Sequence, residues 1–201
     1  MKHRIKLENC IKEFERTGKI EEIREAWGAY REFIEKFPFR RDLTSINNLR
    51  PEDIYNPGSK EKEYFFYYIE HKLRRLLGPG IWNQTAQESA RDNLERFKEF
   101  LRIVIDDNVP VHQKVEFLSD LRGWGEDCTL AKKIVFLYNI DSIIPIFITK
   151  KLEEVIRGLG FTDEHLDGLS NSYFGKSYSD LSVGEKFELI NQFLLTVKRM
   201  Y

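Results

Sequence analysis

Cysteine is scarce in this sequence, which contains only Cys10 and Cys128 among its 201 residues. The two lie far apart, each within a helix-like apolar pattern, so we expect no structural disulfide and a reducing cytoplasm as the surroundings. The N-terminus has no apolar core of signal-peptide length, and the longest apolar neighbourhood, around Ile143 to Ile148, is far too short to cross a bilayer. The sequence therefore predicts a cytoplasmic protein that does not span a membrane.

An excess of charge of either sign is also missing. The chain has 32 Lys and Arg against 33 Asp and Glu, a formal net charge of -1, so no overall field draws it toward nucleic acid. Contact with a polyanion would have to come from a local basic patch. The hydrophobic content of 41% argues against a disordered chain, and 201 residues suffice for one substantial core.

No catalytic or metal-binding motif is recognisable. The four histidines show no paired spacing with Cys or carboxylates, and no G-x-S-x-G elbow occurs. Gly175-Lys176-Ser177 resembles the end of a phosphate-binding loop, but Gly168 precedes Gly175 by seven residues instead of five and no apolar strand comes before it, which favours a plain surface turn. We therefore expect a binding module that is not an enzyme, with no cofactor and no metal.

Apolar residues recur at three- and four-residue intervals along much of the chain, which is the pattern of helices packed on one side. Three such stripes predict long helices: Ile20, Ile23, Trp27, Tyr30, Ile34 and Phe37, ended by Pro38; Ala90, Leu94, Phe97, Leu101 and Val104; and Val183, Phe187, Ile190, Leu194 and Val197. Shorter helices are predicted at about 3 to 16, just after Pro51, near 111 to 121, at 128 to 139 and at 150 to 159. Trp27, on a periodic helix, is expected in the core.

Segments rich in Pro, Gly, Asn and Ser predict turns at 55–59, 78–80 and 168–172. The β-branched run from Ile143 to Ile148 carries a Pro and could be a short extended or edge segment. The sequence thus predicts a mainly α, compact multi-helix domain over 1–201 with at most one or two short extended segments. The last helix reaches Tyr201 without a Gly or Pro stop, so either the natural chain continues or this end is a frayed C-terminus.

Five consecutive aromatic residues, Tyr64-Phe65-Phe66-Tyr67-Tyr68, form the most unusual segment. Successive residues of a helix rotate by about 100°, so the five cannot share one face. Apolar residues from Phe66 to Leu77 fall on one side, and the opposite side gathers phenols and cations: Tyr64, Tyr67, Tyr68, His71, Arg74 and Arg75. This second face suits base stacking and phosphate pairing. The alternative is a central helix between two layers, with its tyrosine hydroxyls hydrogen-bonded at the rim.

Two tryptophans, Trp82 and Trp124, lie in glycine-bearing turns. An indole in such a place either stacks on a ligand, such as an extruded base, or caps the core. The pair Arg40-Arg41, like Arg74-Arg75, could meet phosphates if the fold brings the cations together, or could be ordinary surface charge.

The segment from Leu118 to Tyr138 resembles a helix-hairpin-helix element. In such an element a Gly-x-Gly turn, here Gly123-Trp124-Gly125, presents backbone N–H groups to a DNA phosphate, and Lys132 and Lys133 would add charge nearby. The small packing residue, Ala131, follows Gly125 by six positions where four is usual, so an ordinary helical hairpin is the alternative. The position of the aspartate that promotes base excision reads Ile-Pro-Ile-Phe, so we expect no excision chemistry.

Six segments share a further, collective pattern: EKFPF at 35–39, RPEDIYNPGS at 50–59, EYFFYYIEHKL at 63–73, ARDNLERFKEFL at 90–101, GWGEDCTLAKKIVFLY at 123–138 and IIPIF at 143–147. Together they resemble the N-terminal region of archaeal McrB-like AAA+ proteins, the motor subunits of modification-dependent restriction systems. The resemblance implies a region that recognises DNA, often with a modified base, beside a GTP-hydrolysing motor and a partner nuclease. The motor is absent from this sequence, and contact residues cannot be carried across because these recognition regions differ in fold.

We therefore expect an N-terminal DNA-recognition module for methylated or otherwise modified DNA, serving an AAA+ motor domain beyond residue 201 and, through it, a partner nuclease subunit. The first alternative is a protein-interaction or assembly domain whose aromatic helix packs on another subunit, and the second is an enzyme with an unrecognised site. The candidate DNA contacts are Arg40, Arg41, Tyr64, Tyr67, Tyr68, His71, Arg74, Arg75, Trp82, Gly123, Trp124, Gly125, Lys132 and Lys133.

Overall fold

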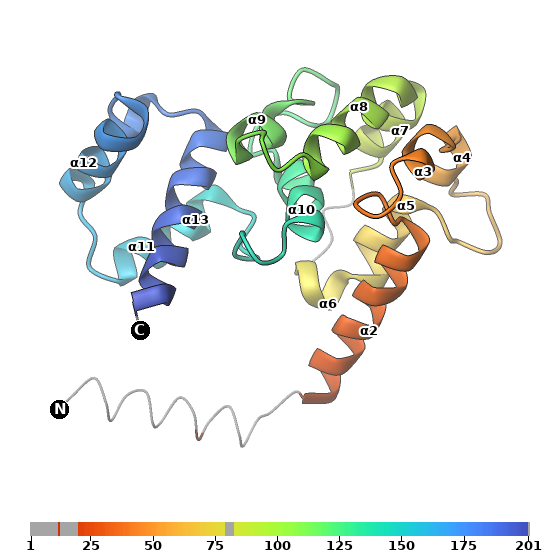
Figure 1. Ribbon diagram of the computed structural model, residues 1–201, viewed down its shortest axis with the longest axis horizontal. Coiled ribbons are helices and arrows are strands. Elements are labelled where there is room, and N and C mark those ends of the chain that lie inside the picture. The colour runs from red at the N-terminus through yellow and green to blue at the C-terminus, as the bar shows by residue number, and fades with distance from the viewer. Residues whose placement is uncertain (1–11, 13–19, 79–82, 201) are drawn as a thin grey trace.

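The computed structural model describes residues 12, 20–78 and 83–200, and every regular element among them is a helix (Figure 1). The mainly α fold predicted from the sequence is confirmed. The predicted helix at about 3 to 16, apart from Lys12, lies outside the described residues, as do Trp82 and part of the predicted turn at 78–80. No helix in these ranges combines the length and the apolar character needed to cross a membrane.

The first long helix, α2 (Ile20–Lys36), ends just before Pro38, as its apolar stripe predicts. Its C-terminal half packs into the core, where Phe33 is fully buried and the hydroxyl of Tyr30 donates a 3.0 Å hydrogen bond to the carbonyl of Leu137. Trp27, in the N-terminal half, is 43% exposed. The prediction of a core position for Trp27 is wrong, because the N-terminal half of α2 lies at the edge of the molecule (Figure 1) and buries Ala26 instead.

The aromatic segment does not form one regular helix. After the short helices α3 (Thr44–Asn47) and α4 (Pro51–Ile54) and the predicted turn at 55–59, the chain forms α5 (Phe65–Tyr67), a π-helical turn η1 (Tyr68–Lys72) and α6 (Arg74–Leu77). In η1 the amide of Leu73 donates a 2.8 Å hydrogen bond to the carbonyl of Tyr68, five positions earlier. The turn therefore contains one residue more than an α-helical turn does. As a result, the residues after it point in directions other than those expected for one regular α-helix.

Two helices, α7 (Gln84–Asp92) and α8 (Leu94–Ile105), replace the single helix predicted from the stripe at 90–104. The break falls at Asn93, whose backbone N–H and side-chain Nδ2 both donate to the carbonyl of Ser89, at 3.0 and 2.8 Å. A short amide side chain that competes for a helix carbonyl in this way favours a break. The apolar stripe still faces inward on both sides of it, with these residues buried: Ala90, Phe97, Leu101 and Val104.

The remaining predicted helices are present. They are α9 (Val111–Glu116), which stops before its predicted end near 121, α10 (Thr129–Tyr138), α11 (Thr149–Gly158) and α13 (Val183–Met200). The run from Ile143 to Ile148 is irregular and forms no strand. It is held to α13 because the amide of Ile144 donates a 2.7 Å hydrogen bond to Oδ1 of Asn191.

The helix α12 (Asp163–Phe174) occupies the place of the turn predicted at 168–172, so that prediction is wrong. The helix starts with a capping box in which Thr162 and His165 bond each other's backbone amides. Asn171 and Ser172 then bond carbonyls four positions earlier, which satisfies their side chains without interrupting the helix. The residues 175–177 follow as a plain surface turn before the 3-10 turn η2 (Tyr178–Asp180), in agreement with the sequence.

Helices α9 and α10 lie between the group formed by α2 to α8 and the group formed by α11 to α13 (Figure 1). Buried apolar residues from both groups belong to one continuous core. The last helix, α13, packs chiefly on α9. The closest approach is at Gly184, where an added Cβ would lie 2.7 Å from the carbonyl oxygen of His112, so only glycine allows this distance.

Candidate functional site

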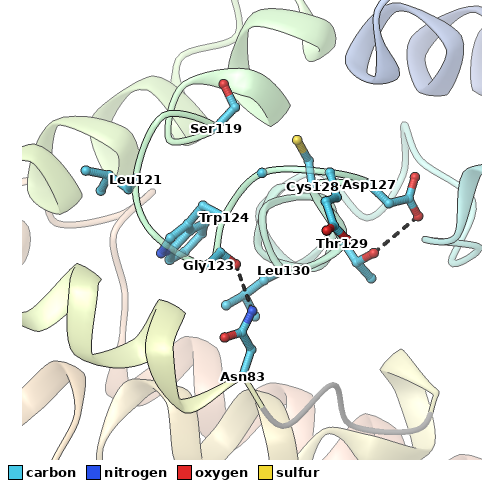
Figure 2. A pocket seen from close by; sticks show the side chains of 11 residues that line it. Asn83, Ser119, Leu121, Gly123, Trp124, Asp127, Cys128, Thr129 and Leu130 are labelled. Carbon is cyan, nitrogen blue, oxygen red and sulfur yellow. Dashed lines mark hydrogen bonds between the residues drawn. The ribbon is translucent and has the colours of Figure 1, made fainter.

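The loop between α9 and α10, residues 117–128, is the first candidate, because it contains the Gly-Trp-Gly turn singled out in the sequence. Beside it lies a cavity of about 520 Å³, whose walls include Asn83 at the start of α7 and Leu130 at the start of α10 (Figure 2). Figure 2 shows Asn83 reaching the loop, where its Nδ2 donates a 2.7 Å hydrogen bond to the carbonyl of Gly123. The loop joins two helices, as predicted, but is longer than a helix-hairpin-helix turn.

Gly123 and Trp124 fix this loop to α7. Gly123 has a φ of 87°, and an added Cβ would lie 2.7 Å from the backbone nitrogen of Ala86. The indole of Trp124 is 2% exposed, donates a 2.9 Å hydrogen bond to the carbonyl of Ala86, and packs among these aromatic rings: Phe66, Phe97 and Phe100. Trp124 therefore caps the core, as the second of its two interpretations holds, and offers no indole face to a base.

An ion pair between the buried Lys132 and the partly exposed Asp127 ties the same loop to the start of α11. The side chain of Lys132 is fully buried, and its Nζ donates to Oδ1 of Asp127 at 2.8 Å and to Oγ1 of Thr149 at 2.7 Å. Asp127 also accepts a 3.1 Å hydrogen bond from the amide of Thr149. Burial lowers the pKa of Lys132, against the opposing effect of Asp127. Because these neighbours enclose the ammonium group, Lys132 cannot reach a DNA phosphate in this structure.

Cys128 lies in the cavity wall directly before α10, with a φ of 48°. It is buried, and burial raises the pKa of its thiol to about 11. The thiol is therefore protonated near neutral pH, a form that is neither a nucleophile nor a metal ligand. Among the described residues, no group of three or more His, Cys, Asp or Glu side chains is placed to hold a metal ion.

The phenolic face of the aromatic segment is largely inside the protein. Tyr64 and Tyr68 are 6% and 1% exposed. The hydroxyl of Tyr68 donates a 2.9 Å hydrogen bond to Oε1 of Glu32 on α2, and the ammonium of Lys72 lies 4.3 Å from the centroid of the Tyr68 ring. The expectation of a free face is wrong for these two tyrosines: Glu32 and Phe33 of α2 cover Tyr68, and the ring of Tyr64 packs against those of Tyr55 and Tyr67. The layered alternative, with its hydroxyl bonded at the rim, describes Tyr68.

The other residues of that face lie nearer the surface. Tyr67 is half-buried, and its ring centroid lies 4.7 Å from that of the exposed His71. Arg75 forms a salt bridge with Glu25 of α2, whereas Arg74 is exposed and has no carboxylate partner in the described ranges. Half of the six residues of this face are thus either covered or already neutralised.

The remaining predicted cations are divided between buried, paired and free positions. Lys133, on α10, is 2% exposed and cannot meet a phosphate without rearrangement. Arg40 bonds Oδ1 of Asp107 at 2.8 Å and Oδ1 of Asn139 at 2.8 Å. Arg41 is exposed without a carboxylate partner among the described residues. The structure therefore brings the predicted contacts into no single basic patch within the ranges it describes, and Trp82 lies outside them.

A surface that the sequence did not single out lies at the start of α2. We call residues Glu21–Trp27 the α2 tip. Ile23 and Trp27, one helical turn apart, are each 43% exposed, and the ring of Trp27 meets that of Tyr30 edge-on at 5.6 Å. The exposed pair thus continues the stripe that enters the core from Tyr30 onward. The periodicity marked these residues as apolar but could not tell where along α2 the body of the protein begins.

Comparison with known protein families, with curated proteins and with solved structures found no match to this chain. Its function therefore has to be inferred from the surfaces of the molecule itself.

Proposed function

We propose that this chain is a helical protein-interaction module that binds its partner through the α2 tip. The observation that carries the proposal is the exposure of Trp27 and Ile23. They lie toward the N-terminal end of the apolar stripe of α2, whose residues from Tyr30 onward pack into or against the core. Tryptophan is among the residues most enriched where binding energy concentrates in interfaces. Two apolar residues one turn apart also match the spacing by which helices pack against one another.

The charges around the α2 tip indicate the chemistry of the partner. Three acidic residues, Glu21, Glu22 and Glu25, share the tip with Arg24, which pairs with Glu21, while Arg75 of α6 pairs with Glu25. The tip with its ion-pair partners therefore carries a formal charge of -1. An amphipathic helix with an apolar face and basic flanks would complement this surface. If the resemblance to McrB-like proteins holds, such a partner would be an AAA+ motor domain or a nuclease subunit, and this chain would be an assembly domain. A cytoplasmic location agrees with the buried Cys128, which forms no disulfide in the described part of the chain.

Two designed peptides can stand in for the partner and test this proposal. One is a Leu/Lys amphipathic helix and the other a Leu/Glu helix of the same length. We expect the basic peptide to bind and to change the emission of Trp27, and the acidic peptide to bind at least about tenfold more weakly. The Ile23→Ser/Trp27→Ala variant should lose the binding, whereas Leu43→Ser, at an exposed apolar position away from α2, should keep it. Equal binding by both variants would refute the proposal.

Recognition of DNA, methylated or unmodified, is a second candidate. The observation in its favour is the exposed stretch Arg122–Glu126, apart from buried Trp124, in which the amides of Gly125 and Glu126 donate no hydrogen bond within the described part of the chain. Backbone N–H groups of this kind can hold a phosphate, and Arg122 would add a cation. The nearby carboxylate of Glu126 opposes such binding, which is why this candidate comes second.

Fluorescence anisotropy with unmodified, cytosine-methylated and adenine-methylated duplexes separates the two candidates. A DNA-binding loop should give binding that weakens steeply with salt and falls in Arg122→Ala. Absence of binding to every duplex at low salt would end the DNA proposal. An apolar peptide complex on the α2 tip should instead persist as salt is raised.

A further inference from the structure

The carboxyl group of Glu70 is buried, and no hydrogen bond to it occurs in the part of the chain that the structure describes. Glu70 lies in the π-turn η1, is 4% exposed, and neither Oε1 nor Oε2 has a hydrogen-bond partner among residues 20–78 and 83–200. An ionised carboxylate in such a place is costly, and a buried polar group left unsatisfied in a native structure calls for an explanation. The π-turn is a second unusual feature at the same position, since such turns are rare and occur frequently at functional sites.

Few charges face Glu70 from the elements around η1. Lys133 of α10 is buried and acts on the charge of Glu70. Glu32 of α2 is bonded to Tyr68 and Lys72, and η1 itself also carries His71 and Lys72. Helix α6 carries Arg74 and Arg75, and α5 consists of Phe65, Phe66 and Tyr67 only. Burial dominates and raises the pKa of Glu70 to about 7, while Lys133 acts in the opposite direction. The group thus changes charge in the range where proteins usually work.

The same segment holds α2 in place. Lys72 of η1 pairs with Glu32, and Arg75 of α6 pairs with Glu25, so both elements are attached to α2 by charged contacts. The extra residue in the π-turn provides a route for movement, because a shift to α-helical bonding would re-aim Glu70 relative to its surroundings.

We propose that η1 and α6 form a protonation-controlled clasp on α2: uncharged Glu70 keeps the clasp closed, and loss of its proton loosens it together with the first half of α2. The driving force is the cost of a buried charge, which falls when the segment opens and lets water reach the carboxylate. The proposal stands independently of what α2 binds.

Amide hydrogen exchange at pH 5 and pH 8, corrected for the intrinsic exchange rate, tests the clasp. In the wild type, opening of residues 68–77 and 20–28 should increase roughly 70-fold between the two pH values, as a carboxyl pKa near 7 in the closed state and near 4.5 in the open state requires. Glu70→Gln should remove this increase, and the control Glu99→Gln, at an exposed position on α8, should retain it. An increase of equal size in Glu70→Gln, or one spread evenly over α8 and α13, overturns the proposal.

A direct titration keeps the proposal testable even if Glu70→Gln does not fold. The side-chain carboxyl carbon of Glu70, followed by NMR in the wild type, should titrate near pH 7, and Lys133→Met should move the midpoint upward because it removes the facing cation. A midpoint near 4.5 in the wild type would show that Glu70 is solvated and that no clasp of this kind exists.

Discussion

The indole N–H of Trp124 donates a 2.9 Å hydrogen bond to the backbone carbonyl of Ala86, 38 positions earlier in the sequence. This bond joins the loop after α9 to the helix α7, inside a cluster of aromatic rings. The tryptophan therefore specifies where a long connection lies, in addition to filling the core.

Replacement of Trp124 by Phe should lower the free energy of unfolding by about 1–3 kcal/mol, because the hydrogen bond and part of the ring are lost while an aromatic group remains. Urea unfolding at neutral pH measures the change. Trp27→Phe, at a ring that is 43% exposed, should stay within about 0.5 kcal/mol of wild type. Comparable losses in the two variants would contradict the assignment of Trp124 to the core.

Gly123→Ala should destabilise the protein by about 2 kcal/mol or more, because the new Cβ meets the backbone of Ala86 and a φ of 87° strains any side chain. Gly28→Ala is the matched control: Gly28 lies inside α2 with open space around the Cβ position, so alanine should stabilise by up to about 1 kcal/mol. Thermal unfolding of the two variants should give shifts of opposite sign. Shifts of the same sign would show that the loop does not lie against α7.

Lys132→Met should cost about 2 kcal/mol, since it removes the cation that faces Asp127 in the interior. The cost is smaller than for a fully buried pair because the Asp127 side chain is 33% exposed. The double variant Lys132→Met/Asp127→Asn should recover part of the loss, as no charge is then left without its partner. Denaturant unfolding of the single and double variants checks this, and a double variant less stable than Lys132→Met would argue against the ion pair.

The stability of the wild type relative to Glu70→Gln should depend on pH. The pKa of Glu70 in the folded state, about 7, lies above its ordinary value of 4.5, so the proton favours the folded state. The contribution is present in full below about pH 4.5 and is lost as pH rises to about 7, by up to about 3 kcal/mol in all. Urea unfolding between pH 4.5 and pH 8 gives the difference curve. A flat curve, or one that rises with pH, would exclude a buried Glu70.

The helices were predictable where apolar spacing alone decides them. The stripes that end at Phe37 and begin at Val183 give α2 and α13 because in each the apolar residues recur at helical spacing over several turns. Apolar spacing did not predict the break at Asn93, the π-turn at Tyr68 or the continuous α12. The break and α12 depend on hydrogen bonds of polar side chains, and the π-turn depends on one inserted residue. The periodicity of apolar residues contains neither kind of information.

The candidate site was predictable only in part, for a similar reason. The Gly-Trp-Gly turn stands out in the sequence, but its partner Ala86 is set by tertiary packing. The burial of Tyr68 depends on Glu32 of α2 reaching its hydroxyl, and the exposure of Trp27 depends on where α2 leaves the body. Composition identifies which residues can form such contacts, whereas only the assembled fold determines which of them remain accessible.

The contact between α9 and α13 has a consequence for how the protein tolerates change. Gly184 has no Cβ. A Cβ at this position would lie 2.7 Å from the carbonyl oxygen of His112 and 2.9 Å from side-chain carbons of Glu116. A methyl group there would push α13 away from α9, and Phe187, a fully buried residue of α13, would then lose part of its packing. Substitution at this one position would thus expose apolar surface between α9 and α13, which favours self-association of the protein.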